Sequence, residues 1–245
     1  MSASHTHSQG QGLETGCGQQ RQSSLESGFQ VQDFGMADYR LIWKRQKAWV
    51  DKRLKEEVPD AVLVGEHFPV ITMGRGSHSE NLLAPHIPTV AIERGGDVTY
   101  HGPGQIVAYP ILQLPEGRRD LHQYLRLLEE AVIRTLLDFG IEGLRNPGYT
   151  GVWVKSKPLE NEQGDLRKIC AIGVAVKRWV TYHGLSLNVD CDLSAYAQIN
   201  PCGLESTIMT RMSDLISTPI HPQEVKTTLS KVLFSTLPFS GNHKA

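Results

Sequence analysis

The stretch from Lys168 to Cys202 constrains the fold of this 245-residue chain more than any other stretch. Two runs with the pattern of strands, 168–176 and 181–189, predict a β-hairpin that turns through Lys177-Arg178-Trp179. A lysine opens the first run, and Asn-Pro-Cys-Gly follows the second run at 200–203. We therefore expect a fold that brings an amine and a thiol from the two ends of this stretch together.

Such a pair would change the chemistry of the thiol. A free cysteine has a pKa near ~8.5, and a nearby cation lowers it. Lys168 could be that cation, and it could also take the thiol proton and later protonate a leaving group. Our hypothesis is a Lys–Cys pair that moves an acyl group. The alternative remains open: Cys202 could be a small buried apolar residue and Lys168 a solvated one.

The other three cysteines are weaker candidates. Cys170 shares a strand face with Lys168 if side chains alternate strictly, which makes it a rival partner. We rank it below Cys202 because a cysteine within an apolar strand usually serves packing. Cys191 has no obvious activator, and Cys17 is incidental. The spacing contains no Cys-x-x-Cys pair, so neither a metal site nor a disulfide framework is predicted, and a reducing cytoplasm fits best.

A glycine-rich segment, Arg94–Gln105, breaks the regular patterns around it. Four glycines and one proline in twelve residues predict a loop whose backbone comes close to another group. Unobstructed N–H groups in such a loop suit carbonyl or phosphate groups of a ligand. The segment matches neither the P-loop nor the dinucleotide fingerprint, and a long β-hairpin turn is the competing interpretation. We interpret His101, taken by itself, as a structural histidine and not as a general base.

The remaining pattern predicts three helices among short strands. The apolar spacing predicts helices over 39–57, from 121 onward after an Asp120 cap, with Gly140 at the C′ position, and over 222–237. Strands are predicted at 61–65, 70–73, 89–93, 106–112 and 151–154, and 155–165 is expected to form a charged loop. This order is compatible with an α+β fold without selecting it.

Composition excludes several classes of protein. The net charge of −1 predicts no broad basic face for nucleic acid, and no apolar run approaches the ~18 residues that a membrane span needs. Residues 1–28 are polar and predict a disordered tail without a secretory signal. We expect one domain over 29–245.

Four segments together resemble those of the lipoyl(octanoyl) transferases. They are Pro69–Arg75, the glycine-rich Arg94–Gln105, the pair Lys168–Gly173 and His183–Val189, and Asn200–Gly203. The resemblance covers about residues 39–215. It implies an α+β fold, a mixed sheet flanked by helices like that of biotin and lipoate protein ligases.

The resemblance also implies a reaction without a cofactor or metal. An octanoyl group would pass from octanoyl-acyl carrier protein to a lysine of lipoyl domains, in 2-oxoacid dehydrogenase subunits or the glycine cleavage H protein. By motif position, Cys202 would carry the acyl thioester, and Lys168 would lower its pKa and shuttle protons. The implied substrate contacts are Arg94, Gly95, Gly96, Asp97, Val98, Thr99, Tyr100, His101, Ala171, Ile172, Gly173, Gly184, Leu185 and Ser186.

Three other functions compete with this one. An ATP-dependent lipoate or biotin ligase on the same fold would need an adenylate-binding loop and no essential thiol. A non-catalytic protein could only dock carrier or lipoyl domains. A thioesterase would give the acyl group to water.

Overall fold

A computed structural model describes residues 29–83, 86–155, 165–201 and 206–239. The predicted tail at 1–28, with Cys17, therefore lies outside the described residues. The main sheet has six strands in the order β1-β2-β6-β9-β8-β7, and a second sheet has the order β4-β3-β5. In the main sheet β1 is parallel to β2 and the other pairs are antiparallel, so the sheet is mixed.

The six strands of the main sheet come from across the chain. They are β1 (Phe29–Ala37), β2 (Asp60–His67), β6 (Gln105–Ile111), β7 (Val152–Lys155), β8 (Leu166–Lys177) and β9 (Val180–Asn188). The second sheet consists of β3 (Val70–Met73), β4 (Thr89–Ala91) and β5 (Val98–His101). The helices are α1 (Tyr39–Arg53), α2 (Leu121–Asp138) and α3 (Pro222–Thr236).

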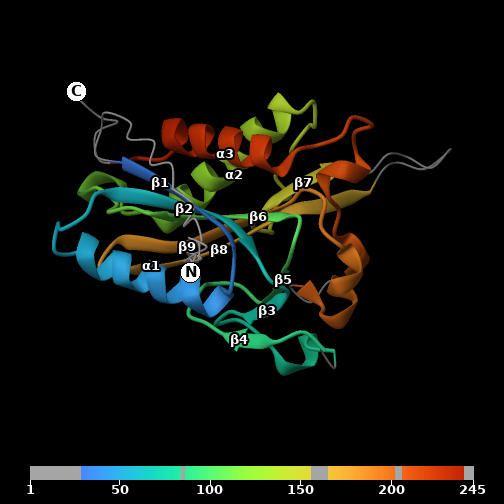
Figure 1. Cartoon of the computed structure of the whole chain (residues 1–245), viewed down its shortest axis with the longest axis horizontal. Coiled ribbons are helices and arrows are strands. Elements are labelled where there is room, and N and C mark those ends of the chain that lie inside the picture. The colour runs from blue at the N-terminus through green and yellow to red at the C-terminus, as the bar shows by residue number, and fades with distance from the viewer. Residues whose placement is uncertain (1–28, 84–85, 156–164, 202–205, 240–245) are drawn as a thin grey trace, which may run out of the picture.

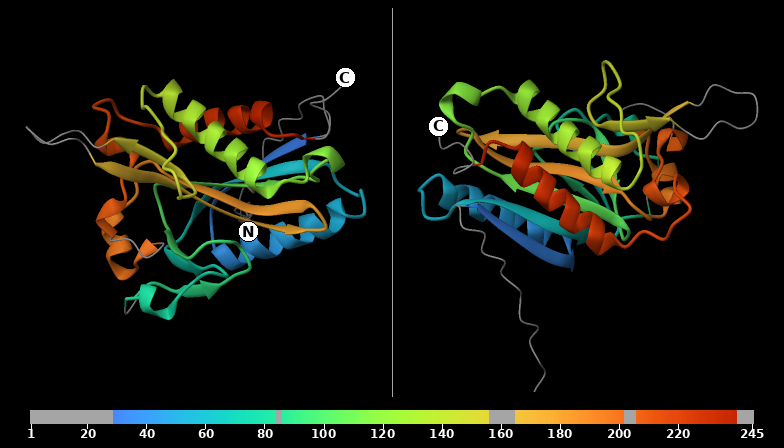
Figure 2. Two further views of the ribbon diagram at one scale, coloured as in Figure 1. Left: turned by 180° about the vertical axis from the view of Figure 1, so that it is seen from behind. Right: turned by 90° about the horizontal axis from the view of Figure 1, so that it is seen from above.

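The helices cover the two faces of the main sheet unequally. Helices α2 and α3 lie side by side on one face, and α1 and the small sheet lie on the other (Figures 1 and 2). This layering confirms the α+β fold, a mixed sheet flanked by helices. The two sides of the main sheet therefore face different neighbours.

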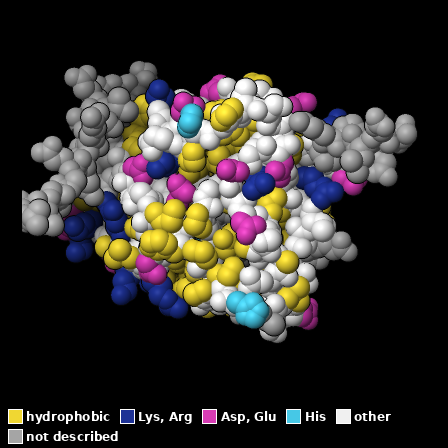
Figure 3. All heavy atoms as spheres, turned by 45° about the vertical axis from the view of Figure 1, so that its right-hand side comes forward, with side chains coloured by type: hydrophobic (Ala, Val, Ile, Leu, Met, Phe, Trp, Pro, Cys, Tyr) yellow, Lys and Arg dark blue, Asp and Glu magenta, His cyan; other side chains and the backbone are white. Residues whose placement is uncertain are grey.

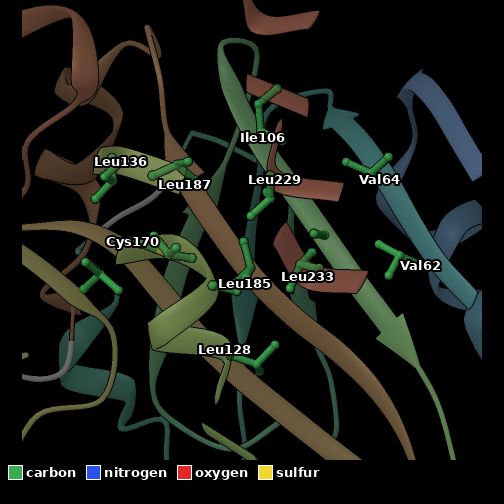
Figure 4. Close-up of a cluster of buried hydrophobic side chains, with 14 of the residues drawn as sticks. Val62, Val64, Ile106, Leu128, Leu136, Cys170, Leu185, Leu187, Leu229 and Leu233 are labelled. Carbon is green, nitrogen blue, oxygen red and sulfur yellow. The ribbon is translucent and has the colours of Figure 1, made fainter. Parts of the chain in front are cut away.

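The face under α2 and α3 carries the largest apolar cluster. Its side chains alternate with those of the opposite face along β2 and β6, as pleated strands require. Each fully buried leucine there contributes about 1.5–3 kcal/mol through area removed from water. Figure 4 shows the cluster, which includes Val62, Val64, Ile106, Leu128, Leu136, Cys170, Leu185, Leu187, Leu229 and Leu233.

The capping signals of α2 are confirmed. Asp120 Oδ1 accepts hydrogen bonds from the backbone N–H groups of His122 and Gln123, at 2.8 and 3.1 Å. Gly140 follows the helix with φ of 72°, the left-handed conformation that a C′ glycine adopts at little cost. The first and last helices are also confirmed, although α1 ends at Arg53, before the predicted end at residue 57.

The strands differ from the sequence-based expectation at two places. One strand was not predicted at all: Phe29–Ala37, directly after the tail, forms β1 at the edge of the main sheet. The glycine-rich segment was expected to be a loop, but Val98–His101 forms β5, because Val98 and Tyr100 pack into a cluster with Ile71 and Tyr196. Only the parts around its glycines depart from regular structure.

The β8–β9 hairpin is confirmed, with a turn at Arg178 and Trp179. Both residues have positive φ, 49° and 66°, which a two-residue type I′ turn requires. Gln113 Nε2 donates to the carbonyl of Arg178, and the N–H of Leu114 donates to that of Trp179. These contacts hold the turn where glycine or asparagine would be the usual choice.

The surface mixes the two signs of charge. On the face in Figure 3, hydrophobic side chains gather near the middle, and lysines and arginines lie mostly toward the margins. None of the helices in the described parts of the chain is long and apolar enough to cross a membrane.

Candidate active site

A pocket of about 510 Å³ opens beside the free edge of β8. Strand β7 pairs with β8 only as far as Cys170, so the residues that follow have no strand on that side. The pocket is lined by every implied substrate contact except Tyr100: Arg94, Gly95, Gly96, Asp97, Val98, Thr99, His101, Ala171, Ile172, Gly173, Gly184, Leu185 and Ser186. Lys168 lines it as well. Tyr100 instead packs against Tyr196, in the cluster of the small sheet.

An irregularity in the sheet turns Lys168 toward this pocket. Lys168 pairs with Trp153 and Cys170 pairs with Val152, so one extra residue, Ile169, is inserted in β8. Neighbours on β7 point to opposite faces, and Lys168 and Cys170 therefore do too. The expectation that they share a face was wrong, because strict alternation fails at this bulge. The Lys168 Nζ lies 5.5 Å from the centre of the Trp153 ring.

The side chain of Lys168 is only 6% exposed and fits into space left by a glycine. A Cβ on Gly151 would lie 2.8 Å from Lys168 Cε, and Gly151 has φ of 120°. The nearby buried carboxylate of Glu129 is bound by Arg126, Arg145 and the N–H of Gly151. Among the described residues, Lys168 has no salt bridge, so its ammonium is not neutralised by a carboxylate.

Cys202 lies outside the described residues, within the gap 202–205. The residues around this gap do line the pocket: Pro201 immediately before it and Met209 soon after it. Pro201, Met209 and Lys168 therefore line one cavity, although Lys168 is more than thirty positions earlier in the chain than Pro201.

Backbone hydrogen bonds hold both sides of this gap. The N–H of Asn200 donates to the carbonyl of Asn81 at 2.9 Å. The N–H of Thr210 donates to the carbonyl of Lys168 itself at 3.0 Å. The chain after the gap is thus attached to the same residue that supplies the amine.

The two cysteines that the structure describes are buried and unsuited to nucleophilic attack. Cys170 packs among the apolar side chains of the α2–α3 face, and burial raises the pKa of its thiol well above the usual range (Figure 4). Burial likewise raises the pKa of Cys191 to about 12. The ranking of Cys170 below Cys202 as partner of Lys168 agrees with this burial.

Arg94 holds the glycine-rich segment against β3 and β8. Its Nη2 donates to the carbonyl and the hydroxyl of Thr72, at 2.8 and 3.0 Å, and its Nη1 donates to the carbonyl of Gly95. The N–H of Gly95 donates to the carbonyl of Val174 on the free edge of β8. A Cβ on Gly173 would lie 2.8 Å from the Gly95 carbonyl oxygen, so the close approach requires glycine there.

His101 is bound on both sides of its ring. Its Nδ1 lies 2.8 Å from Gln105 Oε1, and its Nε2 lies 3.4 Å from the hydroxyl of Thr72. The amide nitrogen of Gln105, with two protons, lies within hydrogen-bond distance of three other acceptors, so its oxygen is the atom that accepts the proton of His101 Nδ1. Burial lowers the pKa of His101 to about 3. These contacts favour the structural interpretation of His101 over that of a base.

Sequence reasoning missed several residues that line the pocket. They come from α1, β6, the start of α2 and the loop before β7: Tyr39, Tyr109, Leu121, His122, Leu125, Gly148, Tyr149 and Thr150. No local pattern distinguishes them, since they meet only through the fold. His183 also lines the pocket and belongs to a recognised motif, where it received no role. No group of three or more potential ligands among the described residues could hold a metal ion.

Comparison with known proteins identifies the family to which this fold belongs. A family model described as the lipoyl protein ligase A/B catalytic domain matches residues 38–234. A solved structure of lipoate-protein ligase A bound with ATP is similar in fold, with a TM-score of 0.62 and 15% sequence identity, over 86% of this chain and 85% of that one. The fold and the pocket thus define a catalytic domain of this class.

Curated relatives narrow the class further. An octanoyltransferase from Syntrophotalea carbinolica is 43% identical over 197 residues, which cover 80% of this chain and 89% of that protein. Another from Geobacter metallireducens is 43% identical over 213 residues, with 85% and 95% covered. The chain belongs to the octanoyltransferase family.

Proposed function

We propose that this protein transfers an octanoyl group from octanoyl-acyl carrier protein to a lysine of lipoyl domains. The acceptors would be 2-oxoacid dehydrogenase E2 subunits and the glycine cleavage H protein. The observation that carries the proposal is that Lys168 lies in one pocket with Pro201 and Met209, which flank the segment containing Cys202. The names of the relatives support octanoyl as the acyl group. Residues from 29 onward would form the single catalytic domain.

The first half of the reaction would form an acyl-enzyme. Lys168 takes the proton of the Cys202 thiol, and the thiolate attacks the carbonyl carbon of the donor thioester. The bond from that carbon to the carrier sulfur breaks, and the Lys168 ammonium protonates the departing thiolate. One thioester replaces another, so the step needs no ATP. A reducing compartment such as the cytoplasm would keep Cys202 as a thiol.

The second half would transfer the acyl group to nitrogen. The amine of the acceptor lysine attacks the Cys202 thioester, and neutral Lys168 accepts a proton from that amine. The carbon–sulfur bond breaks, an amide forms, and Lys168 returns the proton to Cys202. The pocket beside Ala171–Gly173 and Gly184–Ser186 would hold the alkyl chain, because glycine and small side chains leave room for it.

The decisive experiment is incubation with octanoyl-acyl carrier protein alone, without acceptor or ATP. We expect intact-protein mass spectrometry to show one octanoyl adduct, mapped by peptide analysis to Cys202. Cys202→Ser should abolish the thioester adduct, and the matched variant Cys170→Ala should keep it. An adduct on Cys170, or none, would contradict the assignment.

The same mixture separates the competing functions. Amide product formed without ATP after addition of a lipoyl domain excludes the ligase. Free octanoate released without an acceptor would indicate a thioesterase. Binding of both partners without turnover would indicate a docking protein.

A further inference from the structure

His183 has an unusual conformation within β9. Its φ is 56°, although the residue is not glycine and lies inside a strand. Its backbone N–H does not serve the sheet but donates to Gln46 Oε1 on α1, at 2.8 Å. The pairing with β8 runs unbroken through this residue, so the positive φ changes the direction of its side chain and not the register of the strand. The ring of His183 lies 4.9 Å from that of Tyr182, the preceding residue.

The imidazole of His183 is buried, and no hydrogen-bond partner for it lies in the part of the chain that the structure describes. His183 is 1% exposed, and neither ring nitrogen has a hydrogen-bond partner among the described residues. The buried Nε2 of Gln46 likewise has no hydrogen-bond partner within the described ranges. Burial lowers the pKa of His183 to about 4, so the ring is neutral near pH 7 and carries one donor and one acceptor.

The ring lies at the end of the pocket that is far from Lys168. His183 pairs with Val174 on the free part of β8, whereas Lys168 lies on the part of β8 that pairs with β7, so the two residues mark opposite ends of the lining. His183 interacts electrostatically with Arg94 and His101, which also line the pocket. The far end is therefore polar.

The walls between these two ends are different. The strands there contribute mainly small or apolar residues, namely Ala171, Ile172, Gly173, Gly184, Leu185 and Ser186. An alkyl chain that starts near Lys168 meets such residues first and reaches polar groups only at the His183 end. The lining thus changes from favourable to unfavourable for a methyl terminus along the pocket.

We propose that His183 limits the length of the acyl chain that the pocket accepts. This inference rests on the proposed function. A buried imidazole without a protein partner satisfies its donor and acceptor with water. A chain that extends past this point strips those hydrogen bonds and leaves the nitrogens unpaired, which is costly in a buried site. His183 is thus a specificity-determining residue for the far end of the chain.

The test is a competition between octanoyl- and dodecanoyl-acyl carrier protein, with acyl-enzyme quantified by intact mass spectrometry. A ratio of adducts measured in one tube does not depend on the fraction of active enzyme, so a purely structural defect does not move it. We expect His183→Leu to raise the dodecanoyl-to-octanoyl ratio about tenfold over wild type, equivalent to about 1.4 kcal/mol. Asn tolerates positive φ and keeps a donor and an acceptor, so His183→Asn should leave the ratio within about twofold.

His183→Gly provides a second apolar variant, because glycine adopts positive φ without strain even if His183→Leu fails to fold. It should change the ratio in the same direction as leucine. The inference is overturned if neither apolar variant changes the ratio, or if His183→Asn relaxes it as much as they do, since size would then set the limit. Absence of any acyl-enzyme from wild type with either chain would instead contradict the proposed function, and the inference with it.

Discussion

The two faces of the main sheet are built from the same strands but have different roles. The face under α2 and α3 is apolar throughout its cluster, and even its cysteine is an inert packing residue. The face toward α1 and the small sheet buries polar groups, including Gln105, Ser186, Asn188 and the redirected His183. Burying polar groups costs free energy unless each finds a partner. The comparison indicates that the apolar face contributes most of the stability. The polar face loses some stability because it buries the groups that line the pocket.

The largest effect should follow from removing the amine of the second face. Lys168→Ala should reduce octanoyl transfer ~10²–10⁴-fold, the range for a lost general acid–base. Lys168→Ala should also raise the pH needed to alkylate Cys202, because the cation that favours the thiolate is gone. Rates of transfer and of iodoacetamide labelling against pH measure both.

The matched control for Lys168→Ala is Lys177→Ala, on the same strand. Lys177 forms an exposed salt bridge with Asp51, 2.7 Å long, and does not line the pocket. The variant Lys177→Ala should leave the rate of octanoyl transfer and the pH profile of Cys202 alkylation unchanged. An unchanged alkylation profile in Lys168→Ala would remove Lys168 from its role.

The first face should respond in stability instead. Leu128→Ala removes a fully buried side chain from the apolar cluster and should lower the free energy of unfolding by about 2–5 kcal/mol. Urea denaturation measures this loss, and activity per folded molecule should persist. Leu137→Ala on the same helix, at a residue 66% exposed, should change stability by less than about 0.5 kcal/mol. Equal losses in the two variants would break the contrast between the faces.

The smallest effect concerns pH and the buried histidines of the second face. Burial lowers the pKa of His67 to about 4, whereas an unfolded histidine titrates near about 6.5. Below about pH 6.5 this histidine binds a proton in the unfolded chain but stays neutral in the folded protein, so stability decreases as the pH falls toward 4. We expect a loss of roughly 1–2 kcal/mol for this histidine by pH 5.

Urea titrations of wild type and His67→Gln at pH 7.5 and 5 test this sign. The variant removes hydrogen bonds to Tyr109 and Ala37, so its absolute stability should drop at both pH values. Its stability should nevertheless change less between the two pH values than that of wild type. Parallel losses would show that His67 does not contribute to the acid sensitivity.

Much of the first face could be predicted from the sequence. The apolar stripe of α2 repeats at helical spacing and its ends carry Asp120 and Gly140, so local chemistry defines the helix. Strand β1 could not be predicted in this way. Its side chains are mostly half-buried or exposed, and its pairing with β2 reaches across the whole of α1.

The second face could be predicted only in part. The glycine-rich segment and the β8–β9 hairpin identified most of the pocket lining, because glycines mark close approaches. The bulge at Ile169 depends on the partner strand β7, and the positive φ of His183 depends on Gln46, far away in sequence. No pattern within the local sequence contains that information.

The extra residue at Ile169 makes residue spacing a functional property of β8. Deleting it would restore strict alternation and rotate the amine of Lys168 toward the leucines under α2 and α3. A design that places this amine on another pair of strands must therefore include the inserted residue as well as the lysine itself. In a relative of this chain, the gain or loss of one residue between Lys168 and Ala171 would turn the lysine away from the pocket, and another residue would have to supply the amine.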